Sequence, residues 1–327
     1  MKLQKKRLDK ILYVAMRYDY GRPEQGTSFE FNNFFRSFER LVPNVVEFDF
    51  MTVMQKFGKE EMNSKLLDVA RREQPDLIFF MLFTEEITKH TLAALTRQYV
   101  TFNWFCDDHW RFSNFSRYYA PFFSYISTTD ANAMPKYNGI GYRNAFLTQW
   151  GCNQFDYVRI PTTVKEYDVT FIGQPHGNRR RLIRSLRDAG IHVEAFGQGW
   201  EKGRVSQEQM IHIVNASKIN LNLANSSWNI STIFRRSQQI KGRNFEIPGC
   251  GGFLLTNYVE GLENFYDLDN EIGCFRDKRE LVNKIRYYLT HDKEREEIAG
   301  RGYERTIRNH TYEMRFKKLL DHMGFAL

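Results

Sequence analysis

Short apolar runs alternate with helical patterns along the whole chain of 327 residues, and the alternation restarts after a turn-rich stretch at residues 151–167. Such runs are typical of strands buried in a parallel sheet, with the helices serving as crossovers between them. The pattern therefore predicts two α/β domains, each a doubly wound, Rossmann-like sheet. We expect a first domain at residues 1–155 and a second at 156–327, whose last helix either stays with it or packs back on the first.

The apolar runs give the expected positions of the strands. In the first half they lie at residues 11–16, 45–50, 77–83, 99–105, 125–128 and 145–147, and in the second at 168–173, 192–196, 219–223, 252–256 and 271–275. Three helices are expected to close the chain, at residues 277–290, 292–308 and 311–323. Open α/β sheets bind ligands beyond the carboxyl ends of their strands, so we expect the site in a central cleft between the two domains.

Charge and cysteine usage narrow the classes of function. The 47 basic and 39 acidic side chains give a net charge of +8, which favours an anionic partner such as a nucleotide, a nucleic acid or an anionic membrane. No apolar run reaches the roughly 20 residues of a membrane span, and the run at 11–16 is shorter than a signal-peptide core. Cys106, Cys152, Cys250 and Cys274 form no CxxC pair. We therefore expect a cytoplasmic protein with reduced thiols and without a metal site or cofactor.

A glycine-rich segment at residues 241–256 places one carboxylate beside cationic and flexible groups. Glu246 falls in a short expected helix, Gly251 and Gly252 follow it, and Lys241 and Arg243 precede it. A carboxylate suits two adjacent sugar hydroxyls, while glycine amides and cationic side chains suit a diphosphate. The same residues also fit a tight helix-to-strand turn with a surface salt bridge, so the pattern alone leaves both readings open.

A run of arginines opens the expected helix that begins near residue 178. Arg179 and Arg180 lie in its first turn, where the helix dipole is positive and an arginine can stabilise a departing pyrophosphate. The alternative is a solvated arginine face. We predict that one of these two arginines, rather than the whole run, contacts the phosphates.

Three polar residues follow the expected strand at 99–105. Asp107, Asp108 and His109 would project from its carboxyl end, where they could take the proton of an acceptor hydroxyl or hydrogen-bond to sugar hydroxyls. A simpler interpretation is a helix N-cap provided by Asp108. A metal site would need further ligands from elsewhere in the chain, and none is expected.

The segment 243–256 also carries a resemblance, because it reads RNFEIPGCGGFLLT. This resembles the signature of CgeB-like (spore-protein type) glycosyltransferases, within the GT-B group 1 glycosyltransferase superfamily. Further similar segments are DVTFIG, which ends at Gly173, and FGQGW, which contains Gly197; the resemblance covers residues 168–320. Gly173 and Gly197 are assigned to donor binding on this basis.

The resemblance implies a GT-B enzyme that needs no metal ion. It implies a nucleotide-sugar donor, with UDP-sugar as the first expectation, held by the second domain, and an acceptor held by the first. Related enzymes use a pair of glutamates, of which the second binds the donor ribose and the first faces the donor sugar. Glu246 matches the second glutamate, whereas Gln238 stands in the place of the first.

These observations predict transfer of a sugar from a nucleotide diphosphate to an acceptor hydroxyl on a glycan, protein, lipid or nucleic acid. One alternative is a nucleic-acid glycosyltransferase of the phage-DNA type, with which the net charge of +8 is compatible. The other is a non-catalytic binding or assembly protein with the GT-B fold, which the glutamine at position 238 keeps open.

Overall fold

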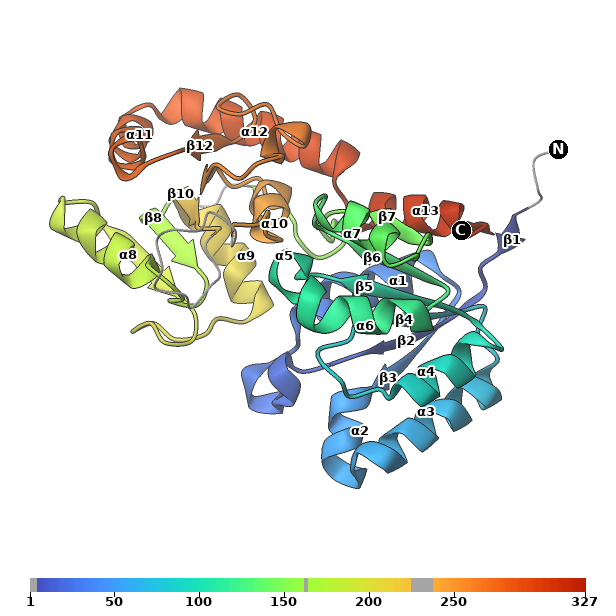
Figure 1. Cartoon of the computed structure of the whole chain (residues 1–327). Helices are drawn as coiled ribbons and strands as arrows, with labels where there is room; N and C mark the ends of the chain where they lie inside the picture. Colours follow the sequence, from blue (N-terminus) through green and yellow to red (C-terminus); the bar gives the residue numbers. More distant parts are fainter. Residues whose placement is uncertain (1–4, 162–163, 225–237) are drawn as a thin grey trace. The chain divides into compact units, whose positions relative to one another are not determined.

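The computed structural model describes residues 5–161, 164–224 and 238–327 (Figure 1). The chain divides into two compact units. The first comprises Met1–Gln149 together with Tyr312–Leu327, and the second comprises Trp150–Thr311. The division thus falls close to the expected boundary at residue 155, and the final helix belongs to the first unit.

A six-stranded parallel sheet forms the centre of the first unit, and its order is β3-β2-β4-β5-β6-β7. Its strands are β2 (Lys10–Ala15), β3 (Asn44–Asp49), β4 (Leu77–Phe80), β5 (Val100–Phe105), β6 (Tyr125–Thr128) and β7 (Ala145–Leu147). Its helices are α1 (Arg36–Leu41), α2 (Phe50–Phe57), α3 (Lys59–Glu73), α4 (Lys89–Thr96), α5 (Asp108–Arg111), α6 (Arg117–Tyr119), α7 (Ala133–Gly139) and α13 (Tyr312–His322). Figure 1 shows α3 and α4 on one side of this sheet and α13 on the other.

Alternation along β4 explains how this sheet is covered on both faces. Ile78 and Phe80 join one apolar core with Leu66 of α3 and Leu92 of α4. Phe79 points to the opposite face because successive side chains of a strand alternate. Both faces of the strand are therefore buried, as its continuous apolar run predicts.

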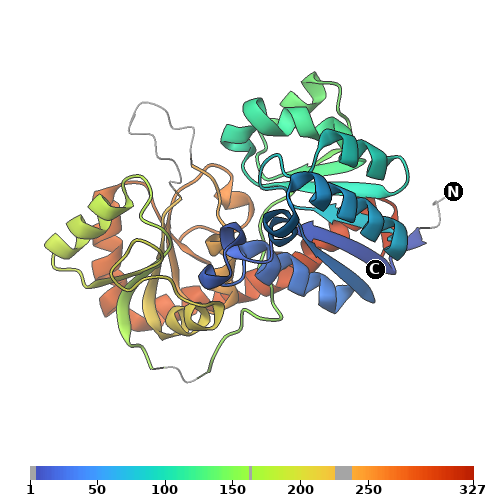
Figure 2. The ribbon, with the colours of Figure 1, turned by 90° about the horizontal axis from the view of Figure 1, so that it is seen from below.

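Aromatic rings make up the core on the second face. Phe79 lies 4.9 Å from Phe38 of α1 and 6.0 Å from Phe316 of α13, and the rings of Phe38 and Phe316 stack at 4.0 Å. Nearby, β1 (Lys6–Arg7) pairs in parallel with β13 (Phe325–Ala326), so segments from near the two ends of the chain lie side by side (Figure 2). Much of the aromatic content of the first half thus serves core packing.

The second unit is built on a five-stranded parallel sheet in the order β12-β11-β10-β8-β9. Its strands are β8 (Tyr167–Ile172), β9 (Val193–Phe196), β10 (Ser217–Asn222), β11 (Leu254–Asn257) and β12 (Gly273–Phe275). Its helices are α8 (Arg179–Asp188), α9 (Gln207–Ala216), α10 (Arg243–Gly249), α11 (Lys278–Thr290) and α12 (Asp292–Asn309). The expectation of two Rossmann-like α/β domains is confirmed.

Each sheet contains a topological switch point, where the loops after two neighbouring strands run in opposite directions. In the first unit the chain leaves β2 for β3 on one side and returns to β4 on the other; in the second it leaves β8 for β9 and returns to β10. Ligands of open α/β sheets bind at such points, beyond the carboxyl ends of the strands. The two carboxyl edges are therefore where functional side chains are sought.

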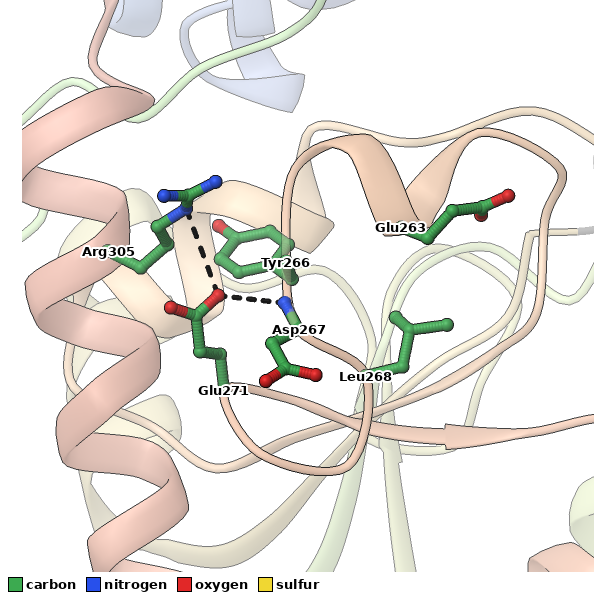
Figure 3. A pocket seen from close by; sticks show the side chains of 6 residues that line it. All are labelled: Glu263, Tyr266, Asp267, Leu268, Glu271 and Arg305. Carbon is green, nitrogen blue, oxygen red and sulfur yellow. Dashed lines mark hydrogen bonds and ion pairs between the residues drawn. The ribbon is translucent and has the colours of Figure 1, made fainter.

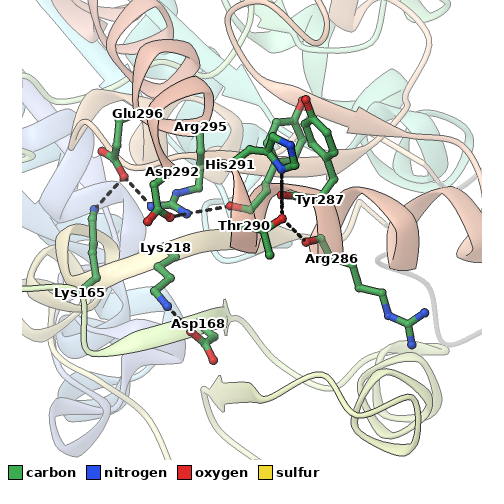
Figure 4. A network of polar contacts seen from close by, with 11 residues as sticks. Lys165, Asp168, Lys218, Arg286, Tyr287, Thr290, His291, Asp292, Arg295 and Glu296 are labelled. Atoms are coloured by element: carbon green, nitrogen blue, oxygen red, sulfur yellow. Dashed lines mark hydrogen bonds and ion pairs between the residues drawn. The ribbon is translucent and has the colours of Figure 1, made fainter.

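The opposite edge of the second sheet is occupied by paired charges (Figure 4). Lys218 Nζ lies 2.7 Å from Asp168 Oδ1 at the beginnings of β10 and β8. The buried Arg295 donates to the carbonyl oxygen of Tyr288 at 2.8 Å and to Asp292 Oδ1 at 2.6 Å, which ties α12 to α11. These contacts give this edge a structural role.

No helix among the described residues is long and apolar enough to cross a membrane.

Candidate active site

Arg179 sits at the switch point of the second sheet. Its Nη1 donates to the carbonyl oxygen of Gln174 at 2.9 Å, and its Nη2 donates to that of Leu223, so one guanidinium joins the loops that follow β8 and β10. The side chain is only 8% exposed, and burial lowers its pKa to about 10. Its Nε–H has no acceptor among the described residues. Arg179 thus keeps a positive charge, at neutral pH, at the point where this fold binds ligands.

Two further groups lie near Arg179. Burial lowers the pKa of His176, and the positive charges of Arg179 and Lys241 lower it further. His176 follows β8, whereas Lys241 precedes α10, so the two come from separate loops. The structure therefore brings the predicted Lys241 and Arg179 into one cationic group. Beside it lies His176, which no sequence motif identified and whose lowered pKa keeps the imidazole neutral at pH 7.

Arg180 occupies a different place from its neighbour. It is exposed, donates to the carbonyl oxygen of Gly199, and lies 5.3 Å from the ring centroid of Trp200. The indole of Trp200 is itself buried, where it donates to the carbonyl oxygen of Gly173 at 2.7 Å. Trp200 therefore packs beneath a loop whose neighbouring residues 198, 199, 201 and 202 are exposed.

Gly173 and Gly197 lie side by side at the carboxyl ends of β8 and β9. The Gly173 N–H donates to the carbonyl oxygen of Phe196 at 2.9 Å. A Cβ at Gly197, whose φ is +130°, would come within 2.6 Å of the Gly173 carbonyl oxygen. Close approach of the two backbones requires a glycine at position 197, and this packing accounts for it without a ligand.

Glu246 is fully buried in the second unit. The Tyr157 hydroxyl donates to its Oε1 at 3.0 Å, and Arg243 forms an ion pair with its Oε2. Burial alone would lower the pKa of Arg243, but the charge and hydrogen bond of Glu246, together with Tyr157 and Cys250, outweigh burial and raise this pKa. Cys152 and Cys250 lie nearby, with thiol pKa values raised by burial and by the carboxylate. The predicted surface salt bridge is wrong, because the carboxylate has no exposed surface, while Arg243 keeps 28% of its side chain exposed.

The diphosphate contact predicted for Gly251 and Gly252 is not supported by their placement. Both lie between α10 and the amino end of β11, away from the carboxyl edge of the sheet. A Cβ at Gly251 would come within 2.8 Å of Arg159 Cγ, and one at Gly252 within 2.6 Å of Val214 Cγ1. These glycines leave room for side chains of the same unit, which is the tight-turn interpretation of the segment.

A buried amide network, missed in the sequence, holds α10 against the carboxyl edge. Asn222 Nδ2 donates to Asn244 Oδ1 at 3.0 Å and lies 3.3 Å from Thr256 Oγ1, and the Lys241 N–H also donates to Asn244 Oδ1 at 3.0 Å. The network thereby fixes the start of α10, and with it the backbone of Lys241, beside the ends of β10 and β11. The asparagines within apolar runs were the only sequence signal for it. Gln238, at the edge of the described segment, is exposed.

In the first unit, the structure separates Asp108 from the other two predicted residues. Asp108 is 1% exposed, and its Oδ2 accepts a hydrogen bond from the Tyr137 hydroxyl at 2.7 Å. Burial raises the pKa of Asp108, although the hydroxyls of Ser116, Thr128 and Tyr137 act to lower it. Asp107, not Asp108, occupies the N-cap position of α5. The expected acceptor contact of Asp108 is therefore wrong, because the carboxylate is used inside the core.

His109 lies near a carboxylate from the next strand loop. Its Nε2 lies 3.9 Å from Oδ1 of Asp130, which follows β6, and the two side chains are 18% and 5% exposed. Asp107 is half-buried at the start of the same helix. A histidine near a buried aspartate can exchange a proton with a ligand hydroxyl. Within residues 5–161, 164–224 and 238–327, no group of three or more His, Cys, Asp or Glu side chains could hold a metal ion.

One cavity of about 510 Å³ lies elsewhere in the second unit, beside β12 (Figure 3). It is lined by Glu263, Asp267 and Glu271 as well as by Arg305, whose Nε is 3.8 Å from Glu271 Oε2. Three carboxylates around one arginine disfavour a diphosphate. This cavity is therefore separate from the predicted donor site.

The comparisons with known proteins agree with the sequence resemblance. Residues 178–321 match the family model described as Glycosyl transferase-like, and this segment contains Arg179, Lys241, Arg243 and Glu246. The chain is 23% identical over 208 residues to Spore protein CgeB of Bacillus subtilis (strain 168). That match covers 58% of this chain and 64% of the relative, which is less than two thirds of the relative's length.

Solved structures support the fold over nearly the whole chain. HepE from Anabaena, in complex with UDP and glucose, has a TM-score of 0.63 at 13% identity, covering 96% of this chain and 99% of its own. Sucrose-phosphate synthase from Thermosynechococcus elongatus has a TM-score of 0.66 at 8% identity, covering 97% of each chain. The expected GT-B fold and the resemblance to CgeB-like glycosyltransferases are both confirmed.

Proposed function

We propose that this protein is a glycosyltransferase that moves a sugar from a nucleoside diphosphate sugar to an acceptor hydroxyl without a metal ion. The observation that carries the proposal is the cationic group of Arg179 and Lys241 at the switch point of the second sheet, with His176, whose pKa is lowered, beside it. It lies at the ligand-binding edge of the fold, in the unit that contains most of the segment matching the glycosyltransferase family. A uridine diphosphate sugar is the first candidate donor, since HepE binds UDP.

Charge stabilisation in this group explains how the reaction proceeds. As the bond between the sugar and the diphosphate breaks, negative charge grows on the leaving phosphate, and fixed positive groups stabilise that charge most where water is excluded. Lys241 is half-buried and Arg179 is nearly fully buried. The Nε–H of Arg179 lacks an acceptor among the described residues, so a phosphate oxygen would satisfy it. These groups take the part that a divalent cation plays in metal-dependent transferases.

The role of Glu246 follows from its partners. Its carboxylate fixes Arg243, and the exposed part of that guanidinium is available to the donor. Because Glu246 is fully buried, direct hydrogen bonding of its carboxylate to the ribose requires Tyr157 or Arg243 to move aside when the donor binds. In either case, loss of the carboxylate weakens donor binding.

Donor turnover is the direct test. The protein is incubated with UDP-glucose and UDP-N-acetylglucosamine, with and without EDTA, and free UDP and released sugar are measured by mass spectrometry. The proposal predicts UDP release that persists in EDTA and falls in Lys241→Ala by about 10- to 100-fold, somewhat less than the loss of a main oxyanion donor. Release that requires an added divalent cation would overturn metal independence, and the absence of nucleotide binding would overturn the function itself.

A further inference from the structure

Three large aromatic side chains are exposed at the carboxyl edge of the first sheet. Tyr20, Phe83 and Trp110 are 46%, 37% and 57% exposed. Tyr20 and Phe83 come from the loops that follow β2 and β4, and Trp110 comes from the short helix α5 that follows β5; these three strands are adjacent in the sheet. We call these three residues the aromatic rim. It includes both loops of the switch point, where this fold binds ligands.

The rim is held in place although it is exposed. Tyr20 and Phe83 meet edge to face with ring centroids 5.9 Å apart. Arg111 Nη1 donates to the carbonyl oxygen of Phe83 at 2.6 Å, and its guanidinium lies 5.5 Å from the ring centroid of Trp110. The three loops are thus connected by specific contacts, so the rings form a defined surface.

The backbone under Tyr20 is strained. Tyr20 has a φ of +51°, in the left-handed region that non-glycine residues rarely adopt, and Gly21 follows at +68°. Gly21 packs so closely on α2 that a Cβ would come within 2.2 Å of Met51 Cγ, and Gln55 Nε2 donates to its carbonyl oxygen at 3.1 Å. Surrounding contacts impose this conformation, and strained residues of this kind cluster at ligand sites.

Carboxylates come from the same loops as the rim. Glu30 follows the β2 loop and lies close enough to Asp19 and Asp107 to be affected by their charges. Burial, reinforced by Asp19 and Asp107, raises the pKa of Glu30 to about 7. Glu30 also lies close enough to affect Cys106 and Tyr13 electrostatically. Directly after Glu30 the chain makes a π-helical turn at Phe31–Phe35, and a second one, Phe112–Ser116, follows α5; such turns often mark functional sites.

We propose that the aromatic rim, Glu30 and Asp107 form the acceptor subsite, and that the acceptor is a saccharide. The apolar face of a sugar ring stacks on aromatic rings, while its hydroxyls donate to carboxylate oxygens. A nucleic acid would also stack on the rim, but the carboxylates of Asp19 and Asp107 repel its phosphates. A lipid tail is disfavoured because it would pack its apolar chain against these carboxylates, and a charged group without a polar partner is costly to bury. The combination therefore favours a saccharide over the other acceptor classes, and this inference rests on the proposed function, whose acceptor it specifies.

Acceptor kinetics test the proposal. Transfer from UDP-glucose is measured to p-nitrophenyl glucoside, galactoside and N-acetylglucosaminide, with a DNA duplex and a dispersed long-chain alcohol as competing acceptor classes. Trp110→Ala and Glu30→Gln are compared with Tyr118→Ala, which removes an aromatic ring of similar exposure, 50%, from α6 of the same unit.

We expect transfer to at least one glycoside, with its KM raised about tenfold by Trp110→Ala, the size of one lost aromatic contact. Glu30→Gln raises the same KM, UDP affinity is unchanged in both variants, and Tyr118→Ala behaves as wild type. UDP binding without transfer to any glycoside, transfer to DNA or the alcohol instead, or an unchanged KM in both variants would overturn the saccharide subsite while leaving the proposed function intact. Failure to bind UDP at all would overturn both.

Discussion

The Tyr157 hydroxyl donates a hydrogen bond of 3.0 Å to Oε1 of Glu246, and the two residues lie far apart in the sequence of the second unit. Arg243 holds the other oxygen, Oε2. A fully buried carboxylate is stable only when both of its oxygens are paired, because an unpaired buried charge is costly. The bond therefore secures the charge that positions Arg243.

Replacing Tyr157 with Phe removes the hydroxyl and leaves the ring. The Oε1 atom of Glu246 then lacks this donor, so we expect the free energy of unfolding to fall by about 1–3 kcal/mol. Urea unfolding followed by circular dichroism measures the change. Tyr118→Phe, at an exposed position, is the matched control and should stay within about 0.5 kcal/mol of wild type. Equal stabilities of the two variants would contradict the pairing.

Gly251 and Gly203 share a left-handed backbone but differ in their surroundings. Their φ values are +74° and +67°; a Cβ would meet Arg159 at position 251 and nothing within 4 Å at position 203. Gly203→Ala should cost only the backbone term of about 1–2 kcal/mol, and Gly251→Ala clearly more. Thermal unfolding of both variants measures the difference. UDP affinity in folded Gly251→Ala should match wild type, and a selective loss of affinity would restore the phosphate contact that its placement argues against.

Asp108 and Asp107 are neighbours with different expected roles. Asp108→Ala leaves the buried Tyr137 hydroxyl without its acceptor, so we expect a loss of about 1–3 kcal/mol in the free energy of unfolding. Asp107→Ala should change stability far less and instead weaken acceptor binding. Unfolding midpoints, together with transfer rates per folded molecule, separate the two effects. A fully stable Asp108→Ala protein without transfer activity would assign the catalytic role to Asp108 after all.

Glu30 should make stability depend on pH. Its pKa of about 7 in the folded state exceeds the ordinary 4.5, so the native state binds this proton more tightly than the unfolded state does. The stability that the protonated form contributes is complete below pH 4.5 and is lost as the pH rises to 7. Glu30→Gln removes that loss, so its advantage over wild type should grow by about 2–3 kcal/mol between pH 5 and pH 8. Urea unfolding at the two pH values measures it, and a constant difference would mean that Glu30 has an ordinary pKa.

The strands could be predicted from the sequence because buried parallel strands are continuous apolar runs, as Ile78 to Phe80 illustrate. Long-range partners could not. The sequence placed Asp108 in the site because it does not reveal the hydrogen bond from Tyr137 that uses this carboxylate in the core. Nor does it reveal that Arg179, predicted to contact phosphates, also donates to the carbonyl oxygen of Leu223. Glu30 lies in no sequence motif, because its raised pKa results from burial and from charges that include Asp107 on another loop. The cleft expected between the domains stays a prediction.

Calorimetric titration of UDP into the protein in the presence of EDTA measures whether the cationic group binds a diphosphate without a metal ion. Wild type is compared with Lys241→Ala and, as a control outside the cationic group, with Lys293→Ala on the exposed face of α12. We expect saturable 1:1 binding to wild type and Lys293→Ala, and an affinity about tenfold lower for Lys241→Ala, the worth of one charge-assisted phosphate contact. Binding of equal strength in all three proteins, or none in wild type with UDP, GDP, ADP or TDP, would contradict this expectation.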